Sequence, residues 1–317
     1  MNKVAIDLFD ENESSDTNGT YLFRPTNGMT PSSLSASEEN FDYLTQESPV
    51  AAELRVLSQP PTIDPISYYR NYVYPVAGRT TYIYHVELGI NQEHDDFHGR
   101  QIEWLYTESS IATGADTMTE AAVGGGHSTC TASKAVGNIY GASKSATLVV
   151  VKMPNLDEAS VSEVLDTVID DINDKDRKRT SVVSISWGSK AIVNNRGTPT
   201  QPTPWTTLAG TLRWQTMMLR LMYVPLVCAA GNAAQQRDVH GLSRLYVDTI
   251  PAAYHHSFPY VVVGNSDNNG VKHPTSQIMS HPGLQVYAPG VGIKCASSTS
   301  STRYRTWSGT SFCRSPL

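Results

Sequence analysis

The chain alternates short, continuously apolar segments with longer segments whose apolar residues recur at helical spacing. The apolar segments are residues 80–90, 145–153, 180–189 and 224–232. The helical segments are residues 159–179, 205–223 and the stretch that follows the glycines at 124–126. Continuous apolar strands are typical of a parallel sheet that is buried on both faces. We therefore predict an α/β fold, in which a mainly parallel, twisted sheet carries helices on both faces.

Residues 1–50 differ from the rest of the chain in composition. They hold nine acidic residues against two basic ones and show no sustained period of 2 or 3.6. We predict a disordered acidic tail here and one folded domain over 51–317. The alternative is a remnant of an inhibitory propeptide, which the missing strand pattern disfavours.

Composition limits the classes of partner. Outside the tail, 22 basic residues balance 21 acidic ones, so no basic surface for nucleic acid is expected. No apolar run approaches the roughly 18 residues of a membrane span, so no membrane partner is expected either. The N-terminus has no visible secretory signal, which leaves the compartment open. The oligomeric state is also open.

Three residues at predicted strand ends or helix starts suggest nucleophilic catalysis: Glu87, His127 and Ser311. A serine hydroxyl is a poor nucleophile until an imidazole removes its proton, and a carboxylate fixes the tautomer of that imidazole. With nine histidines in the chain, this order of residues is weak evidence by itself. The surrounding sequences carry more information.

Six segments resemble, in the right order, the signature blocks of the subtilisin-like serine proteases (the subtilase, or peptidase S8, family). The blocks are YHVELGINQEHDDF (84–97), GGGHSTCTAS (124–133), SISWGS (184–189), CAAGN (228–232), YAPGVGIKCASS (287–298) and WSGTSF (307–312). The resemblance covers about residues 53–312. It includes ELRVLSQPP (53–61), which is similar to the start of mature fungal members.

The resemblance implies a serine endopeptidase that acts through an acyl-enzyme on Ser311. It places the general base at His127, the acid at Glu87 and the oxyanion-hole amide at Asn232, and it makes peptides or proteins the substrates. It also implies substrate-binding residues at Ser186, Trp187 and Gly188 on one side of a specificity cleft. It further implies that Ala229, Ala230 and Gly231 form part of the opposite wall, where their small size suggests room for a large apolar side chain.

Two departures from the family pattern favour an alternative. The family has aspartate where this chain has Glu87, and the longer side chain requires His127 or the strand to shift. In addition, only six residues follow Ser311, with Pro316 among them, so we expect the helix there to be cut short and the C-terminal part of the fold to be missing. The alternative function is therefore a catalytically impaired pseudoprotease that binds peptides or proteins without turnover.

The cysteines and one cluster of histidines and acids have less specific interpretations. Cys130, Cys228, Cys295 and Cys313 show no metal-ligand spacing, and buried free thiols are favoured over disulfides. The segment HDDFH (94–98) invites a metal site, but a solvated loop is favoured. No cofactor is expected. The family often binds calcium, although its sites map to no residues of this chain, and the family is often secreted.

Overall fold

The computed structural model describes residues 44–48, 50–58, 71–75, 81–115, 117–155, 158–190, 204–238, 240–255 and 258–313. The predicted acidic tail, over residues 1–43, and the predicted effect of Pro316 on the last helix concern residues outside these ranges.

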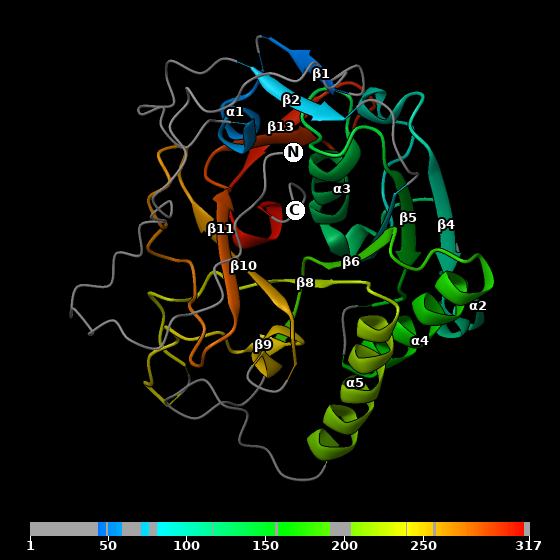
Figure 1. The fold of residues 1–317 in the computed structure, drawn as a ribbon, viewed down its shortest axis with the longest axis vertical. Coiled ribbons are helices and arrows are strands. Elements are labelled where there is room, and N and C mark those ends of the chain that lie inside the picture. The colour runs from blue at the N-terminus through cyan, green and yellow to red at the C-terminus, as the bar shows by residue number, and fades with distance from the viewer. Residues whose placement is uncertain are drawn as a thin grey trace, which may run out of the picture. The chain divides into compact units, whose positions relative to one another are not determined.

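A seven-stranded sheet forms the centre of the fold (Figure 1). Its strands, in spatial order, are β11 (Leu284–Pro289), β10 (Val261–Ser266), β8 (Leu226–Ala229), β6 (Ser181–Ile185), β3 (Tyr82–Glu87), β5 (Thr147–Lys152) and β4 (Ile102–Tyr106). Every neighbouring pair is parallel. The predicted α/β class with a mainly parallel sheet is confirmed.

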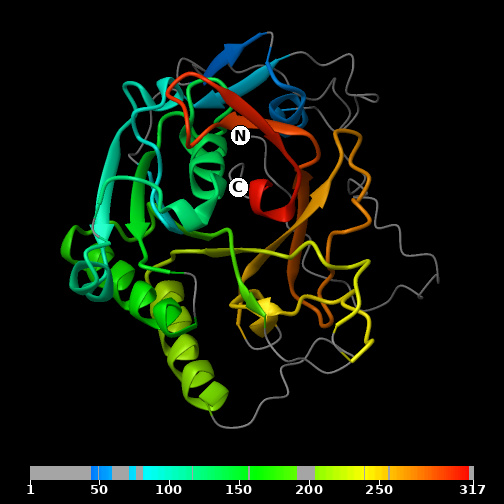
Figure 2. The ribbon, with the colours of Figure 1, turned by 180° about the vertical axis from the view of Figure 1, so that it is seen from behind.

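Helices cover the two faces of the sheet, because alternate residues of each strand point to opposite sides. Ile83 of β3 packs with α3 (His127–Val136) in one apolar cluster. The next residue, Tyr84, packs in a larger cluster with α4 (Glu158–Asp174) and α5 (Pro204–Leu221). Seen from behind, α4 and α5 lie next to each other (Figure 2).

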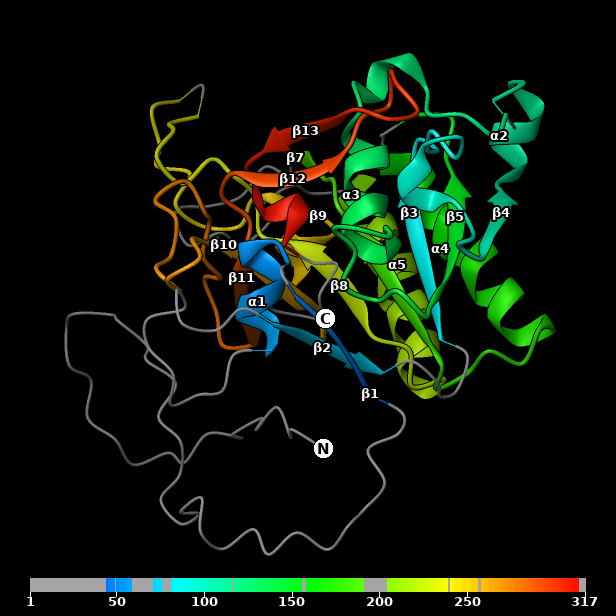
Figure 3. The same cartoon turned by 90° about the horizontal axis from the view of Figure 1, so that it is seen from above.

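Smaller elements complete the described chain. They are β1 (Leu44–Glu47), α1 (Ala52–Ser58), β2 (Tyr72–Pro75), α2 (Glu108–Ala112), β7 (Ser189–Lys190), β9 (Thr249–Ile250), β12 (Ile293–Ala296) and β13 (Tyr304–Trp307). The hairpin of β12 and β13 is antiparallel and lies against α3 (Figure 3).

The segment HDDFH is only in part the solvated loop that we predicted, since Asp95 and His98 are exposed. His94 is 1% exposed and Asp96 is fully buried. The Asp96 carboxylate accepts hydrogen bonds from the Ser133 hydroxyl (2.6 Å) and from the backbone N–H of Ile139 (2.8 Å). These partners replace the water that a buried carboxylate gives up. Within the described residues, no group of three or more His, Cys, Asp or Glu is arranged to hold a metal ion.

The prediction of free cysteines was wrong for one pair. Cys130 of α3 and Cys295 of β12 form a disulfide. The two cysteines are 165 positions apart in sequence, and they meet because α3 packs against β12. Cys228 and Cys313 are buried cysteines outside this disulfide. Among the helices that the structure describes, none combines the length and the apolar character needed to cross a membrane.

The disulfide should contribute measurably to stability. Replacing Cys130 and Cys295 together by alanine should lower the free energy of unfolding by about 2–4 kcal/mol, because the bond closes a long loop. Denaturant titration measures the difference. A reductant should lower the unfolding midpoint of the wild-type chain and leave that of the double variant unchanged; equal midpoints for the oxidised wild type and the variant would contradict the assignment.

Candidate active site

Three neighbouring strands end at the same edge of the sheet, and each end supplies a predicted site residue. Glu87 is the last residue of β3, Ser186 directly follows β6, and Asn232 lies three residues beyond β8. Since β8, β6 and β3 are adjacent and parallel, their carboxyl ends meet. This edge is where α/β sheets place their ligand sites.

Glu87 and His127 form a partly buried pair of a carboxylate and an imidazole. The Glu87 carboxylate is fully buried, and its Oε1 lies 3.3 Å from Nδ1 of His127, whose side chain is 23% exposed. Ser128 donates a hydrogen bond to the other oxygen, Oε2 (3.1 Å). Burial by itself raises the pKa of Glu87, but the charge and contact of His127, with smaller effects of His85 and Ser128, hold the pKa below its usual value. The longer glutamate side chain thus reaches the imidazole.

The start of α3 fixes the position of His127. Gly126 precedes the helix with φ +93°, a conformation that suits glycine, and His127 is the first helical residue. Glu120 then caps the helix from outside: its carboxylate accepts hydrogen bonds from the backbone N–H groups of Gly126 (2.9 Å), Ser128 (3.3 Å) and Thr129 (3.0 Å), and from the Thr129 hydroxyl. An acid at a helix N-terminus satisfies free N–H groups and opposes the positive end of the dipole.

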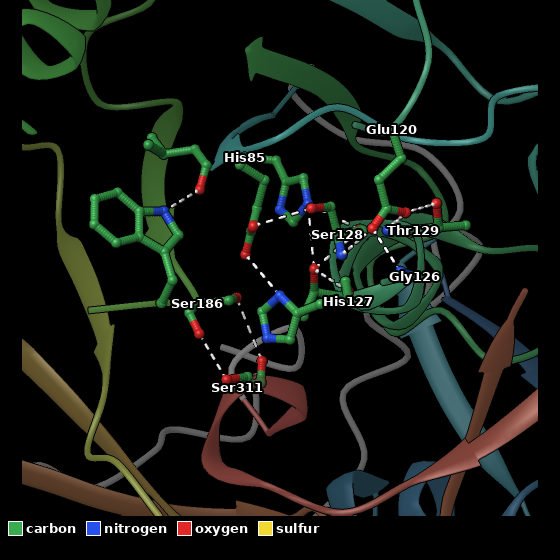
Figure 4. Close-up of polar contacts among 12 residues, drawn as sticks. His85, Glu120, Gly126, His127, Ser128, Thr129, Ser186 and Ser311 are labelled. Atoms are coloured by element: carbon green, nitrogen blue, oxygen red, sulfur yellow. Dashed lines mark hydrogen bonds and ion pairs between the residues drawn. The ribbon is translucent and has the colours of Figure 1, made fainter. Parts of the chain in front are cut away.

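Glu120 is itself held in place by the ends of two strands. The ammonium group of Lys152, the last residue of β5, donates hydrogen bonds to the backbone oxygens of Thr117 (2.8 Å) and Thr119. The backbone N–H of Ala121 donates to the oxygen of Leu88, just beyond β3 (3.0 Å). The residues on both sides of Glu120 are therefore tied to the edge of the sheet. Figure 4 shows the side chain of Glu120 directed at Gly126 and Thr129.

Ser311 lies in a single 3-10 turn, η6 (Thr310–Phe312), which three segments hold. The Thr310 N–H donates to Oδ1 of Asn232 (2.9 Å), and the Gly231 N–H donates to the Thr310 hydroxyl (3.1 Å). We predicted a helix that opens at Ser311; the described residues contain this turn and end at 313. The turn is thus bound to the loop after β8.

The Ser311 hydroxyl donates a hydrogen bond to the backbone oxygen of Ser186 (2.6 Å; Figure 4). The next residue, Phe312, packs its ring against the His127 imidazole at 5.4 Å between ring centres. This contact places η6 beside the start of α3. The structure therefore brings Glu87, His127, Asn232 and Ser311 into one region, while their catalytic roles stay predictions.

A pocket of about 280 Å³ adjoins Ser311. Predicted cleft residues line it: Ser186, Trp187, Gly188, Ala229 and Gly231, together with Asn232. Ala230, predicted as part of the same wall, instead packs in the apolar core and is fully buried. Side chains of successive extended residues point to opposite sides, so the side chain of Ala230 faces away from that of Ala229.

Sequence analysis missed Glu120, Ser128 and the polar part of the pocket, which includes Gln236, Arg244 and Gln277. Glu120 lies seven residues before His127 in a segment without a helical or strand pattern. A carboxylate shortly before a glycine-rich helix start is a weak signal of a cap. Gln277 joins the pocket only through the tertiary fold.

A family model described as the subtilase family matches residues 78–313 of the chain. Among curated proteins, the chain is 36% identical over 127 residues to Alkaline protease 1 of Emericella nidulans. It is 35% identical over 123 residues to the subtilisin-like serine protease Pen ch 13 of Penicillium rubens. Each alignment covers 37% of this chain and 28% or 29% of the relative, so the match spans under a third of the relatives' length.

Two solved structures share the fold. A cold adapted subtilisin-like serine proteinase has a TM-score of 0.57 at 21% identity, covering 85% of this chain and 82% of its own. The epidermin leader peptide processing serine protease of Staphylococcus aureus has a TM-score of 0.58 at 18% identity, covering 76% of this chain and 64% of its own.

Removing the Glu120 cap should destabilise the start of α3. We expect Glu120→Ala to lower the free energy of unfolding by about 1–2 kcal/mol, because three backbone N–H groups lose their acceptor. Denaturant titration measures the loss. Glu108→Ala is the matched control, since Glu108 is an exposed acid in the first turn of α2, a helix capped by Thr107. Equal stability of the two variants would contradict the role of Glu120.

The lowered pKa of Glu87 predicts how acid affects stability. Ionised Glu87 stabilises the folded chain at pH values above its ordinary pKa of 4.5, and this contribution is lost as the pH falls below 4.5 towards the lowered folded value. The difference in unfolding free energy between the wild type and Glu87→Gln should therefore shrink on acidification through this range. Unfolding measured from pH 7 to 3 tests this; a difference that stays constant or grows would refute it. Glu108→Gln provides the exposed control.

Proposed function

Because the chain belongs to the subtilase family, as predicted from its signature blocks, we propose that it is a serine endopeptidase that cleaves peptide bonds through an acyl-enzyme on Ser311. The observation that carries this proposal is the convergence of four segments: the Glu87–His127 pair at 3.3 Å and the Ser311 turn, bound to Asn232 and packed on the His127 ring. The proposed reaction uses groups of the chain itself and needs no cofactor.

In the proposed mechanism, His127 is the general base. Its Nδ1 faces Glu87, which leaves Nε2 as the nitrogen that accepts the proton of Ser311. The hydroxyl first turns away from the backbone oxygen of Ser186, a rotation about one side-chain bond. Oγ then attacks the carbonyl carbon of the substrate, and imidazolium later gives the proton to the leaving amine. The buried charge of Glu87 stabilises that imidazolium.

Asn232 is the proposed oxyanion donor. Its Oδ1 accepts the N–H of Thr310, the residue before Ser311, so its Nδ2 remains available as a donor beside the nucleophile. A donor held in this way stabilises the negative oxygen of a tetrahedral intermediate. The backbone N–H of Ser311 is the second proposed donor. Peptides and proteins are the proposed substrates, with Ser186, Trp187 and Gly188 along one side of the pocket.

A second candidate function is peptide binding without turnover. Two observations favour it: glutamate replaces the family's aspartate at position 87, and the Ser311 hydroxyl donates a hydrogen bond to the backbone oxygen of Ser186. A binding module would keep the pocket and the folded edge of the sheet but would not acylate. Measuring peptide binding and peptide cleavage on the same sample separates the two functions, and Glu87→Asp tests whether the carboxylate limits turnover.

Covalent labelling tests the endopeptidase directly. A fluorophosphonate probe should label the folded wild-type chain and lose at least nine-tenths of that labelling in Ser311→Ala, because only an activated serine attacks phosphorus at a useful rate. Mass spectrometry of the labelled peptide locates the adduct. Ser308→Ala is the control and should retain labelling, since Ser308 is an exposed serine nearby in the chain. A folded wild type without label would exclude acylation and favour the binding function.

A further inference from the structure

An apolar stripe lies exposed on the second half of α5. Trp214 is 55% exposed, Met217 is 46% exposed and Leu221 is 66% exposed. Their spacing of three and four residues places them on one face of the helix. The opposite face packs in the apolar core, where Leu212 and Leu219 are buried. Single exposed apolar residues are common, but a row of three large ones is typical of a surface that another molecule covers.

The stripe separates an acidic side of the surface from a basic side. Gln215 donates a hydrogen bond to the backbone oxygen of Ser162 (2.7 Å), so α4 lies on the Gln215 side of α5. Arg220 is exposed on the other side of the stripe, because five residues turn a helix by about 140°. Asp166 is exposed on α4, one turn beyond Ser162 and on the same side of that helix. The surface therefore runs from Asp166 across the stripe to Arg220.

Arg220 and Asp166 also lie at the same height along the two helices. Each helix connects the carboxyl end of one parallel strand to the amino end of the next, so α4 and α5 run in the same direction. Starting from the contact of Gln215 with Ser162, Asp166 is four residues further along α4 and Arg220 is five residues further along α5. These steps correspond to about 6 Å and about 7.5 Å of helix. The two charges are thus level with each other on opposite sides of the stripe.

A surface of this kind is complementary to itself. A second copy can lie face to face on the stripe, related to the first by a two-fold axis that runs along α5. Each level of one copy then meets the same level of the other, and the basic side of one faces the acidic side of the other. Arg220 of each copy thereby meets Asp166 of the other copy. An axis across the stripe would instead set arginine against arginine.

Both charges are available for such a contact. Among the ion pairs of the residues that the structure describes, none includes Arg220 or Asp166. The apolar residues between them are also suited to an interface, since tryptophan, methionine and arginine are enriched at protein contacts and tryptophan often carries much of the binding energy.

We propose that two copies of this chain associate through α5, with Trp214, Met217 and Leu221 at the centre of the interface and an ion pair of Arg220 with Asp166 on each side. Asp166 disfavours an anionic lipid surface as the occupant, because such a surface would repel the carboxylate beside the stripe. The proposal does not rest on the proposed function.

The interface leaves the Ser311 site open. The backbone N–H of Arg179, two residues before β6, donates to the oxygen of Met222 (3.0 Å), so the end of α5 lies at the amino ends of the strands. The Ser311 site lies at their carboxyl ends, where Glu87 and Asn232 meet. The stripe and the site are therefore at opposite edges of the sheet, and association through α5 does not cover the pocket.

Sedimentation equilibrium of the full chain tests the association. The chain carries Ser311→Ala, so that proteolysis cannot change its mass. We expect a monomer–dimer equilibrium with a dissociation constant on the order of 10 µM, in keeping with a small interface. A chain that stays monomeric up to about 100 µM would overturn the proposal.

A matched pair of leucine variants locates the interface. Leu221→Ala should raise the dissociation constant at least about fivefold, because it removes apolar contact from the centre of the interface. Leu242→Ala makes the same exchange at an exposed leucine in the loop after β8 and should leave the constant unchanged. Equal constants for the two variants would contradict an interface on α5.

An exchange of charges distinguishes a second copy from any other partner. Arg220→Glu and Asp166→Arg should each raise the dissociation constant at least about tenfold, because each sets like charges against each other on both sides of the interface. An equimolar mixture of the two variants should associate to within about threefold of the unchanged chain, since both contacts of the mixed pair join opposite charges. A mixture that does not recover association would refute the proposed geometry.

Flotation with vesicles of phosphatidylcholine and phosphatidylserine examines the other occupant of the stripe. We expect no binding of the chain to these vesicles. If the chain stays monomeric in solution and binds the vesicles, and Trp214→Ala abolishes that binding, the stripe is a lipid-binding surface and the proposal fails.

Discussion

The parallel register of β8, β6 and β3 is the constraint on which the rest of the structure depends. Because these strands are adjacent and run in the same direction, the residues that follow each of them emerge at one edge. Glu87, Ser186 and Asn232 are far apart in sequence, yet they meet without any long side chain reaching across the fold. Buried apolar clusters on both faces of the sheet support this edge.

Two carboxylates act on the start of α3 from different sides. Glu120 binds the free N–H groups of the first turn and so fixes the direction of the helix. Glu87 meets the imidazole of the first helical residue and is itself held by Ser128. The first sets the backbone of His127 and the second sets its ring, so the histidine has little freedom. This division explains how a glutamate in place of aspartate still makes contact with the imidazole.

The Ser311 turn is held by its neighbours rather than by a helix of its own within the described residues. Thr310 is held by the hydrogen bond that its N–H donates to Asn232 and by the one that its hydroxyl accepts from Gly231, and a ring contact with His127 holds Phe312. Asn232 thus has a structural task, accepting the Thr310 N–H, besides its proposed role towards the oxyanion. The same loop carries Gly231, where an added side-chain carbon would lie 2.0 Å from Oε1 of Gln277, so this position requires glycine.

The sequence by itself determined the α/β class, the strands that end at the site, and the family, because apolar periodicity and short signature blocks are local properties. It also brought Glu87, His127, Asn232 and Ser311 forward as candidates. Only the tertiary structure decided the Cys130–Cys295 bond, the burial of His94 and Asp96, and the inward position of Ala230. The polar partners Glu120 and Gln277 were likewise set by contacts between distant segments. Such contacts depend on how helices and loops pack against the sheet, and no local pattern in the chain encodes that packing.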